Sequence, residues 1–234
     1  MVSARLRLFH RLALISLFVL SGCGAVPDGS SKPQMPAPRA TDSSQMLRFD
    51  AGQLELQAQG GLCRLRWRGE LQSDAVQSLG EALRALETRS CTRKTLALDL
   101  QGGDIGPAAT LGSMLKNRQF DTELLANSHC HTPCMMVFAA GRQRQVPDAG
   151  QPARLLLTQP RPDQDFGQTT CATELSLGQQ LLLTRYLRAM LPLSTATALY
   201  QKIGQATCRS HETLGTTEAL ALGLATSTLA PALR

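Results

Sequence analysis

The densest group of residues that could do chemistry spans positions 129 to 134, which read His-Cys-His-Thr-Pro-Cys. Imidazole and thiolate groups are ligands for zinc and copper, and Cys-x₃-Cys is a workable ligand spacing. The two cysteines, Cys130 and Cys134, can instead form a disulfide. The hydroxyl of Thr132 between them can act as a nucleophile if a base activates it. The segment therefore offers three chemistries: metal binding, a disulfide and attack by a hydroxyl.

The N-terminus favours the disulfide, because it predicts export from the reducing cytoplasm. Arginines at positions 5, 7 and 11 precede a mostly apolar run, 12–20. That run is too short to span a bilayer core of about 30 Å. It closes with Leu20-Ser21-Gly22-Cys23, which resembles a bacterial lipobox, the signal that marks a cysteine for lipid attachment. The alternative is an ordinary secretory signal followed by a chance cysteine.

We expect cleavage before Cys23 to remove residues 1–22 as a lipoprotein signal peptide and acyl chains to attach to Cys23. Gly24 follows, instead of the aspartate that in this class often retains lipoproteins in the inner membrane. The expected location is therefore the cell envelope, at the periplasmic face of the outer membrane, with the lipid binding the membrane. Residues 23–46 are rich in Pro, Ser and Gly, which predicts a flexible linker, and 47–234 is the expected folded domain.

The six cysteines that remain after Cys23 predict up to three disulfides in an oxidising compartment. Six cysteines allow 15 connectivities, so the sequence does not fix the pairing. Pairing nearest neighbours gives the candidates Cys63–Cys91, Cys130–Cys134 and Cys171–Cys208, and buried free thiols are the alternative. A disulfide between Cys130 and Cys134 leaves no thiolate there for a metal, and we expect no cofactor.

Composition argues against a nucleic-acid partner. The formal net charge is +6, but the predicted signal carries three arginines and no acidic residue, so the mature chain carries +3. Nucleic-acid-binding domains depend on a denser basic surface. Hydrophobic residues make up 43% of the chain, enough for a sizeable core, and the 4% aromatic content predicts that this core is mostly Leu and Ala.

Strand and helix patterns alternate along the expected domain. Period-two alternation or short apolar runs predict strands at 54–58, 63–68, 94–100, 120–126 and 154–158. Helical spacing predicts helices at 73–86, 108–115, 133–140, 177–191, 195–203 and 217–222. We expect Ser73 to cap the first helix and Leu181 to lie in the core. We expect Arg64, Arg66 and Arg68 to form a solvated strand face, and contact with anionic lipid or glycan is the alternative. This alternation predicts an α/β fold with a mostly parallel sheet.

Three segments, in this order and spacing, resemble the Clp-protease/crotonase superfamily, and within it a group of predicted periplasmic Clp-protease-like proteins. The first is Gly102-Gly103-Asp104 between a strand and a helix, like the family's Gly-Gly turn. The second is Cys130-His-Thr-Pro-Cys134 leading into Met-Met-Val-Phe-Ala-Ala-Gly141, like the group's Cys-Ala-Ser-Ala-Cys segment and buried helix. The third is Thr217-Glu-Ala-Leu-Ala-Leu-Gly-Leu224, like the family's C-terminal Glu-Ala…Gly-Leu helix. The resemblance covers about residues 60–228.

This resemblance implies a repeated ββα spiral and a triad-type hydrolytic site. In active members a serine starts the buried helix, a histidine on the next strand is its base, and an acid orients the histidine. Two backbone N–H groups hold the oxyanion, one from the Gly-Gly turn and one from the residue after the serine. Here the serine position is Thr132, the next residue is Pro133, which has no N–H, and the histidine position falls at Thr158. We therefore expect a catalytically degenerate site.

The remaining polar residues offer no clear replacement for the base. His131 adjoins Thr132, and neighbouring side chains in extended backbone point apart. His129 and His211 are typical of surface or loop residues, and Asp104 is typical of a helix cap.

We expect a scaffold whose cleft beside Gly102 and Gly103 binds an extended peptide or an envelope protein. One alternative is a hydrolase of altered chemistry that uses Thr132. Another is an envelope metal or redox protein that uses Cys130, Cys134 and the flanking histidines. Relatives form rings or trimers, but no residue in this sequence specifies an oligomeric state.

Overall fold

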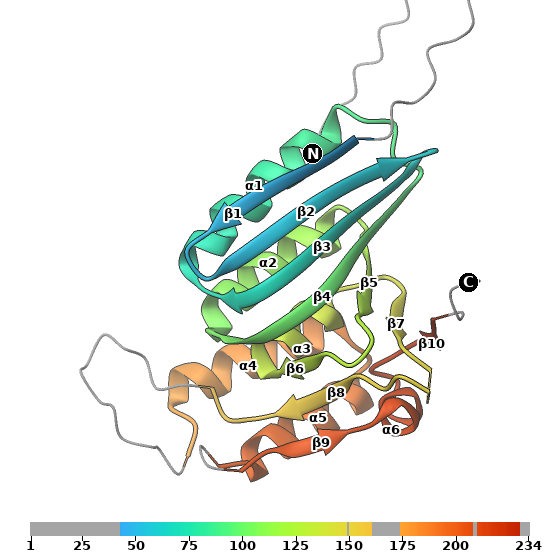
Figure 1. The fold of residues 1–234 in the computed structure, drawn as a ribbon. Helices are drawn as coiled ribbons and strands as arrows, with labels where there is room; N and C mark the ends of the chain where they lie inside the picture. Colours follow the sequence, from blue (N-terminus) through green and yellow to red (C-terminus); the bar gives the residue numbers. More distant parts are fainter. Residues whose placement is uncertain (1–42, 149, 161–173, 208–209, 230–234) are drawn as a thin grey trace, which may run out of the picture. The chain divides into compact units, whose positions relative to one another are not determined.

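The computed structural model describes residues 43–229 except 149, 161–173 and 208–209. All of them fall within one compact unit, Pro38–Arg234, and Figure 1 shows their arrangement. The predicted signal peptide, Cys23 and most of the predicted linker lie outside the described residues. Cys171 and Cys208 lie outside them as well, so their predicted disulfide stays a prediction.

The larger sheet has seven strands within the described residues, in the order β1-β2-β3-β4-β5-β7-β10. The first three form an antiparallel meander, and every pairing from β3 to β10 is parallel. The strands are β1 (Ser43–Phe49), β2 (Gly52–Gln59), β3 (Leu62–Leu71), β4 (Arg93–Gly103), β5 (Asp121–Leu124), β7 (Arg144–Val146) and β10 (Ser227–Thr228). The prediction of an α/β fold with a mostly parallel sheet is confirmed.

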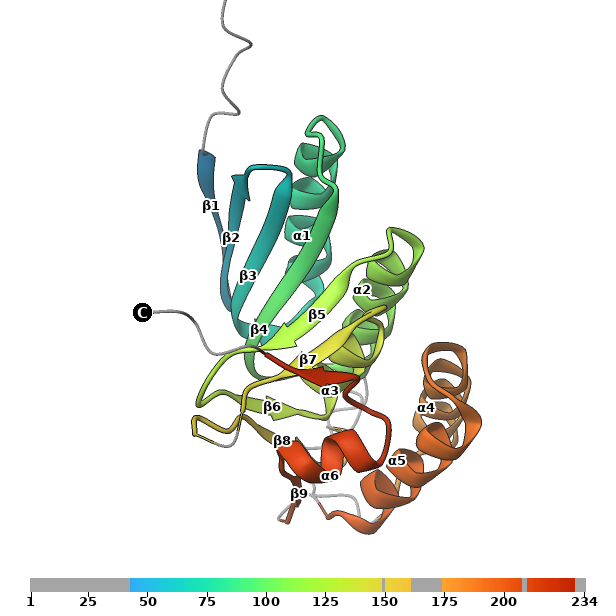
Figure 2. The same ribbon diagram turned by 90° about the vertical axis from the view of Figure 1, so that its right-hand side faces the viewer.

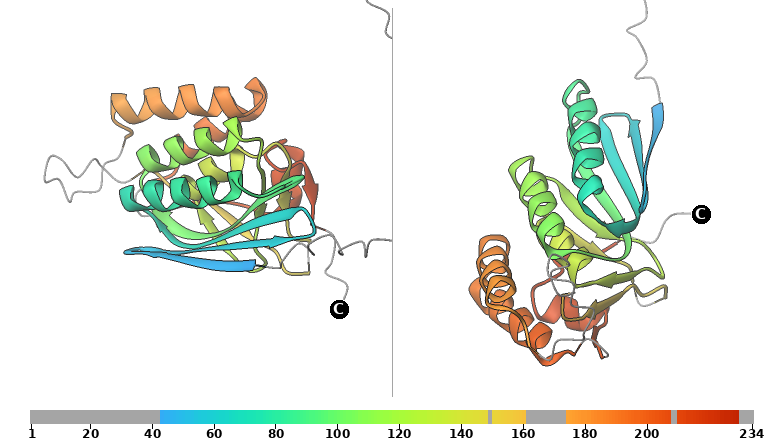
Figure 3. Two further views of the ribbon diagram at one scale, coloured as in Figure 1. Left: turned by 90° about the horizontal axis from the view of Figure 1, so that it is seen from above. Right: turned by 90° about the vertical axis from the view of Figure 1, so that its left-hand side faces the viewer.

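Helices cover one face of this sheet, as Figure 2 and Figure 3 show from two directions. They are α1 (Ser73–Glu87), α2 (Ile105–Asn117) and α3 (Thr132–Ala139). Alternate residues of the central strands are buried on this side: Leu54, Leu56, Leu65, Trp67, Leu96, Leu98 and Leu100. Successive strand residues point to opposite faces, so this burial explains the period-two pattern of the sequence.

The opposite face of the sheet carries the arginine row of β3. Arg64 forms an ion pair with Glu123 of β5, and Arg68 lies 3.4 Å from a carboxylate oxygen of Asp99 on β4. Because neighbouring strands supply acidic partners, this face is mixed in charge and does not form a basic surface.

A smaller sheet and three helices complete the described fold. The sheet has the order β6-β8-β9, with β6 (His129–His131) parallel to β8 (Arg154–Leu157) and β9 (Glu212–Leu214) antiparallel to β8. The helices are α4 (Leu177–Met190), α5 (Leu193–Gln205) and α6 (Thr216–Ala221). The three helices predicted for this part of the chain are therefore confirmed.

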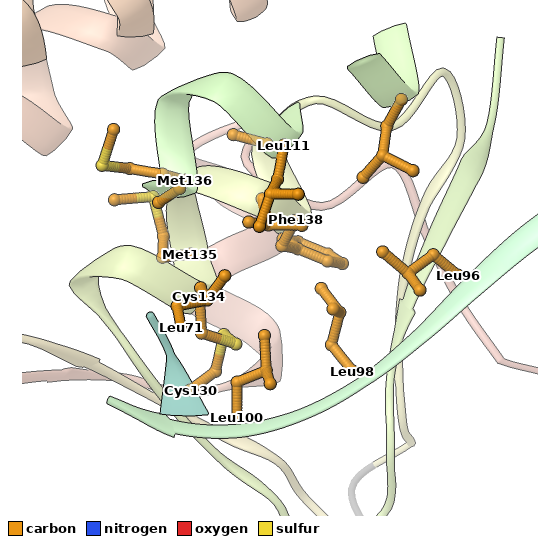
Figure 4. Close-up of a cluster of buried hydrophobic side chains, with 14 of the residues drawn as sticks. Leu71, Leu96, Leu98, Leu100, Leu111, Cys130, Cys134, Met135, Met136 and Phe138 are labelled. Carbon is orange, nitrogen blue, oxygen red and sulfur yellow. A yellow bond between two sulfur atoms is a disulfide. The ribbon is translucent and has the colours of Figure 1, made fainter. Parts of the chain in front are cut away.

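The core centres on α3, whose eight residues are all buried. Figure 4 shows the cluster that it forms with its neighbours: Met135, Met136 and Phe138 of α3, Leu111 of α2, and Leu96, Leu98 and Leu100 of β4. A helix that is apolar on every side is typical of a protein interior. Buried side chains from the neighbouring elements therefore surround α3 and hold it in place.

The folded region begins earlier than the sequence predicts. The linker is expected to run to residue 46, but β1 begins at Ser43 and pairs with β2 from Ser43↔Ala58 onward. Residues 44–46 are exposed, so the backbone alone holds this part of the strand. Hydrophobic alternation, the signal used to find strands, is absent where no side chain is buried.

Two details of the helices also differ from the prediction. Leu181 is expected in the core but is 51% exposed, because the buried face of α4 runs through Leu183 and Leu187. Ser73 is expected to cap α1, but the N-cap residue is Gln72 and no side chain caps the helix. Composition near a helix start locates the start only to within a residue.

Candidate functional site

The Gly-Gly turn at the end of β4 requires glycine. Gly103 has a φ of +126°, and a Cβ placed on it would lie 2.2 Å from the carbonyl oxygen of Leu71 and 2.4 Å from the Leu71 Cβ. The next N–H, that of Asp104, donates to the same carbonyl oxygen at 2.8 Å, and α2 begins directly afterwards. Asp104 occupies the N-cap position as predicted, but its side chain makes no capping hydrogen bond. The turn thus fixes the backbone of Gly102 and Gly103 against β3.

A disulfide closes the segment before α3. Cys130, the middle residue of β6, is bonded to Cys134 in the first turn of α3, with a Cα–Cα distance of 5.2 Å, and both residues are buried. The predicted pairs Cys130–Cys134 and Cys63–Cys91 are therefore confirmed. Because Cys130 and Cys134 are bonded to each other, neither sulfur is a thiolate that could bind a metal or attack a substrate.

Thr132, the predicted nucleophile position, lies between these cysteines as the first residue of α3 and is fully buried. Its hydroxyl donates to the carbonyl oxygen of Thr158 at 2.6 Å and accepts the N–H of Thr158 at 2.8 Å. The structure thus brings together Thr132 and Thr158, the predicted nucleophile and base positions. The contact, however, joins the hydroxyl to the backbone of Thr158 and not to its side chain. The hydroxyl ties α3 to the end of β8.

A small cavity of about 140 Å³ lies next to this tie. Three segments line it: the end of β4, the start of α3 and the residues after β8 (Gln101, Gly102, Gly103, His131, Pro133, Thr158, Gln159 and Pro160). Thr132 is not among the lining residues, although both of its neighbours are. The cavity therefore faces the Gly-Gly turn, while the hydroxyl of Thr132 points into the protein.

The residue after Thr132 offers no backbone donor to the cavity. The family resemblance predicts one oxyanion donor at the N–H of the residue after the nucleophile position. Here that residue is Pro133, which lines the cavity and has no N–H. Loss of one such donor costs about 2.7–4 kcal/mol of transition-state stabilisation.

The three described histidines lie in different surroundings. His131 lines the cavity, whereas His129 and His211 are exposed. Among the residues that the structure describes, no group of three or more His, Cys, Asp and Glu side chains is placed to hold a metal ion. In the same part of the chain, no helix combines the length and the apolar character that a membrane span needs.

Sequence reasoning missed Tyr186, which contacts the backbone of α3. The hydroxyl of Tyr186 in α4 donates to the carbonyl oxygen of Met136 at 2.7 Å. Its ring passes over Gly112 of α2, where a Cβ would lie 1.7 Å from the Tyr186 oxygen. Burial raises the pKa of Tyr186 far above its usual range. The lone tyrosine in α4 and the glycine in α2 are the only sequence signals of this contact, and neither indicates the other.

Comparisons with solved structures identify the fold. The chain is similar to a ClpP1 mutant from Listeria monocytogenes, with a TM-score of 0.54 and 14% identity over 72% of this chain and 92% of that one. It is also similar to an enoyl-CoA hydratase from Mycobacterium marinum, with a TM-score of 0.51 and 16% identity over 75% of this chain and 76% of that one. This protein has the ClpP/crotonase fold. A third similar structure, a mutant of the 1510-N membrane-bound stomatin-specific protease, has a TM-score of 0.54 and 12% identity over 71% of this chain and 78% of that one.

These similarities concern the ClpP/crotonase fold alone. No protein-family model matches the chain, and no curated protein matches it. The resemblance predicted from the Gly-Gly turn, the 130–134 segment and the C-terminal helix is therefore confirmed for the fold.

Proposed function

We propose that this protein is a lipid-anchored scaffold of the bacterial envelope that binds an extended peptide segment beside the Gly-Gly turn and does not catalyse Clp-type hydrolysis. One observation carries the proposal: the hydroxyl at the nucleophile position is buried and hydrogen-bonded to the backbone of Thr158 through both its proton and a lone pair. A nucleophile must hand its proton to a base and reach the substrate. Thr132 in this position does neither.

The missing donor at Pro133 supports the same proposal independently. Even a freed hydroxyl would form an oxyanion with one donor fewer, which alone lowers the rate by about 10²–10³. Two defects in separate parts of the machinery, the nucleophile and the oxyanion hole, are more consistent with lost catalysis than with a substituted residue in a working enzyme.

The end of β4 supports peptide binding by strand addition. β5 pairs with β4 only along Thr95–Leu98, so the β4 residues beyond Leu98 extend past the β5 ladder. The 140 Å³ cavity lies at this end and is lined by Gln101, Gly102 and Gly103. An extended peptide gains backbone hydrogen bonds from such a strand end and specificity from a pocket that takes one side chain. A cavity of this size suits a small side chain.

The anchoring part of the proposal rests on the sequence before Ser43. A basic region, a short apolar run and Leu20-Ser21-Gly22-Cys23 together favour lipid attachment at Cys23. A lipidated chain is heavier than a secreted chain without lipid by the mass of its acyl chains, and it partitions into membranes. Metabolic labelling with an alkyne fatty acid should label the wild-type chain and not the Cys23→Ala variant, and equal labelling of both would refute the anchor.

Lost hydrolysis is tested by covalent labelling. The chain from residue 24 onward should give no stoichiometric mass increase with a fluorophosphonate probe, and Thr132→Ala should behave identically. An adduct on the wild type that is absent from Thr132→Ala would show that the site is still a nucleophile and would favour the altered hydrolase. Free thiols at Cys130 and Cys134 with bound zinc or copper would favour the metal alternative instead.

Peptide binding is tested with fluorescein-labelled β-casein, an unstructured chain, by fluorescence anisotropy. We expect saturable binding that weakens at least about tenfold, or about 1.4 kcal/mol, in Gln101→Trp, because the indole would fill the cavity mouth. Gln77→Trp, the same change at an exposed position of α1, should leave binding unchanged. Equal affinity of both variants would refute this location of the site.

A further inference from the structure

The edge strands of the two described sheets differ in length. Three of them are short: β6 and β9 have three residues each and β10 has two. The fourth, β1, has seven, and Figure 1 shows it as the outermost strand of the larger sheet. An edge strand presents a row of backbone N–H and C=O groups that no neighbouring strand pairs. Within the described residues, β1 is therefore the only long edge on which a further strand can form its hydrogen bonds.

β1 lacks the features that usually block pairing at an edge. Natural edge strands are often protected by prolines, charged side chains or bulges. The sequence of β1 is Ser-Ser-Gln-Met-Leu-Arg-Phe, which holds no proline and a single charge, that of Arg48. Its register with β2 runs without a bulge from Ser43 to Phe49. The free side of β1 is therefore regular along its whole length.

The exposed half of β1 would gain most from a second neighbour. Leu47 and Phe49 pack against the core, whereas Gln45 and Met46 are exposed, Met46 by 46%. Met46 lies directly across from Glu55 of β2, on the face of the sheet away from the helices. A strand added on the free side would cover part of the Met46 side chain and would hold this half of β1 by a second ladder.

The sequence before β1 does not suit this role. Residues 24–42 contain four prolines, at positions 27, 33, 36 and 38, with at most five residues between one and the next. Proline has no N–H to donate to a ladder and is confined to strand ends, edges and bulges. A partner for all seven residues of β1 therefore has to come from outside this segment.

A second copy of β1 meets the requirement. In an antiparallel pair with a two-fold axis at Met46, the central residue, all seven residues face a residue of the other copy, and an axis at any other position shortens the ladder. The two Met46 side chains then face each other, and apolar cross-strand pairs stabilise a sheet. Arg48 faces the partner's Ser44, so the single charge of each strand does not oppose its equivalent. β1 is thus self-complementary in length and in charge.

We propose that β1 pairs antiparallel with β1 of a second copy of this chain, so that the two larger sheets become one continuous sheet across the two-fold axis. Two-fold dimers are the commonest symmetric oligomers, and each copy contributes the same surface to them. The contact is small, so we expect a dissociation constant on the order of 10–100 μM. The pairing is independent of the proposed function, because the Gly-Gly turn lies on β4, three strands away from β1.

The first test measures the dimer dissociation constant of the chain from residue 24 onward by analytical ultracentrifugation. Met46→Lys places two ammonium groups opposite each other at the axis and should raise this constant at least about tenfold. Leu62→Lys is the matched control, because Leu62 is 56% exposed and lies on β3, which has strands on both sides. It should change the constant by less than about twofold. Ser44→Lys, which would face the partner's Arg48, replaces Met46→Lys if that variant fails to fold.

The second test determines the register by disulfide cross-linking with oxidised glutathione. Two cysteines at position 46 would face each other with Cβ atoms about 4.5–5.5 Å apart, whereas two at position 44 would lie roughly 14 Å apart. Met46→Cys should therefore form a covalent dimer on non-reducing gels, and Ser44→Cys should not. The proposal is overturned if the wild type stays monomeric at about 100 μM, if Met46→Lys dimerises as tightly as the wild type, if Leu62→Lys loses as much affinity as Met46→Lys, or if Ser44→Cys cross-links as readily as Met46→Cys.

Discussion

The two ends of β4 treat their polar groups in opposite ways. At the Gly-Gly end, the hydroxyl of Thr132 and the sulfurs of Cys130 and Cys134 are consumed by contacts within the protein. At the other end, the ammonium of Lys94 is left without a partner among the described residues. At the first end, groups that could react are held in contacts that stabilise the fold. At the second end, the cation of Lys94 lies beside the C-termini of α1 and α2.

Removal of a disulfide gives the largest expected loss in the free energy of unfolding, and this loss differs between the two ends of β4. Cys63–Cys91, beside the start of β4, closes a separation of 28 residues, whereas Cys130–Cys134 closes only 4. Chain-entropy arguments give losses of about 3–4 kcal/mol and about 2 kcal/mol when each pair is replaced by alanine. Urea unfolding of the two double variants checks this order. A larger loss for the Cys130–Cys134 pair would mean that the α3 end depends on more than loop closure.

Thr132→Val should cause the next largest loss in the free energy of unfolding. It keeps the side-chain shape but leaves the N–H and the carbonyl of Thr158 without their hydroxyl partner, and buried unpaired groups cost about 1–3 kcal/mol each. We expect a loss of about 2–3 kcal/mol in the free energy of unfolding. Thr132→Ser retains the hydroxyl and should lose only about 1 kcal/mol. If both variants lose the same amount, the hydroxyl does not hold α3 to β8.

Tyr186→Phe tests the support behind α3. It removes the hydrogen bond to the carbonyl oxygen of Met136, and we expect a loss of about 1–2 kcal/mol. Tyr200→Phe is a matched control, because the Tyr200 hydroxyl has no partner among the described residues. Urea unfolding at pH 7 compares the two. An equal effect of both substitutions would contradict a specific role for Tyr186.

The same tyrosine predicts an alkaline loss of stability. Burial raises the pKa of Tyr186 in the folded state, while an unfolded tyrosine ionises near pH 10. Its contribution is therefore complete below about pH 10 and declines as the pH rises further, by up to about 1.4 kcal/mol per pH unit. Unfolding at pH 9 and pH 11 should show this decline in the wild type and in Tyr200→Phe. Tyr186→Phe should lack that part of it, and an unchanged decline would disprove the assignment.

Lys94→Met gives the smallest expected change in stability. Because the ammonium makes no contact that the substitution removes, the free energy of unfolding should change by less than about 0.5 kcal/mol, or rise slightly. This contrasts with Thr132→Val at the other end of β4. A loss of more than about 2 kcal/mol would show that Lys94 stabilises the fold and would end the contrast between the two regions.

Local patterns were sufficient for most elements and for the two described disulfides. The Gly102-Gly103 turn and the apolar helix from Thr132 to Ala139 are encoded by residue type at fixed spacing, so they are found without knowledge of the fold. The whole of β1 was missed, because its exposed residues 44–46 are held by backbone pairing, and the short strands β6, β7, β9 and β10 were missed as well. Side-chain periodicity cannot indicate a strand that buries no side chains.

The sequence by itself determined that position 133 offers no N–H, since a missing N–H is a property of proline wherever it lies. Only the tertiary structure decided what the hydroxyl of Thr132 contacts. Its partner Thr158 is 26 residues away, and Tyr186 is 50 residues from Met136. Lys94 likewise meets the ends of α1 and α2 only because parallel strands and crossing helices bring their ends together. Contacts between residues so far apart depend on topology and side-chain packing, which no local pattern contains.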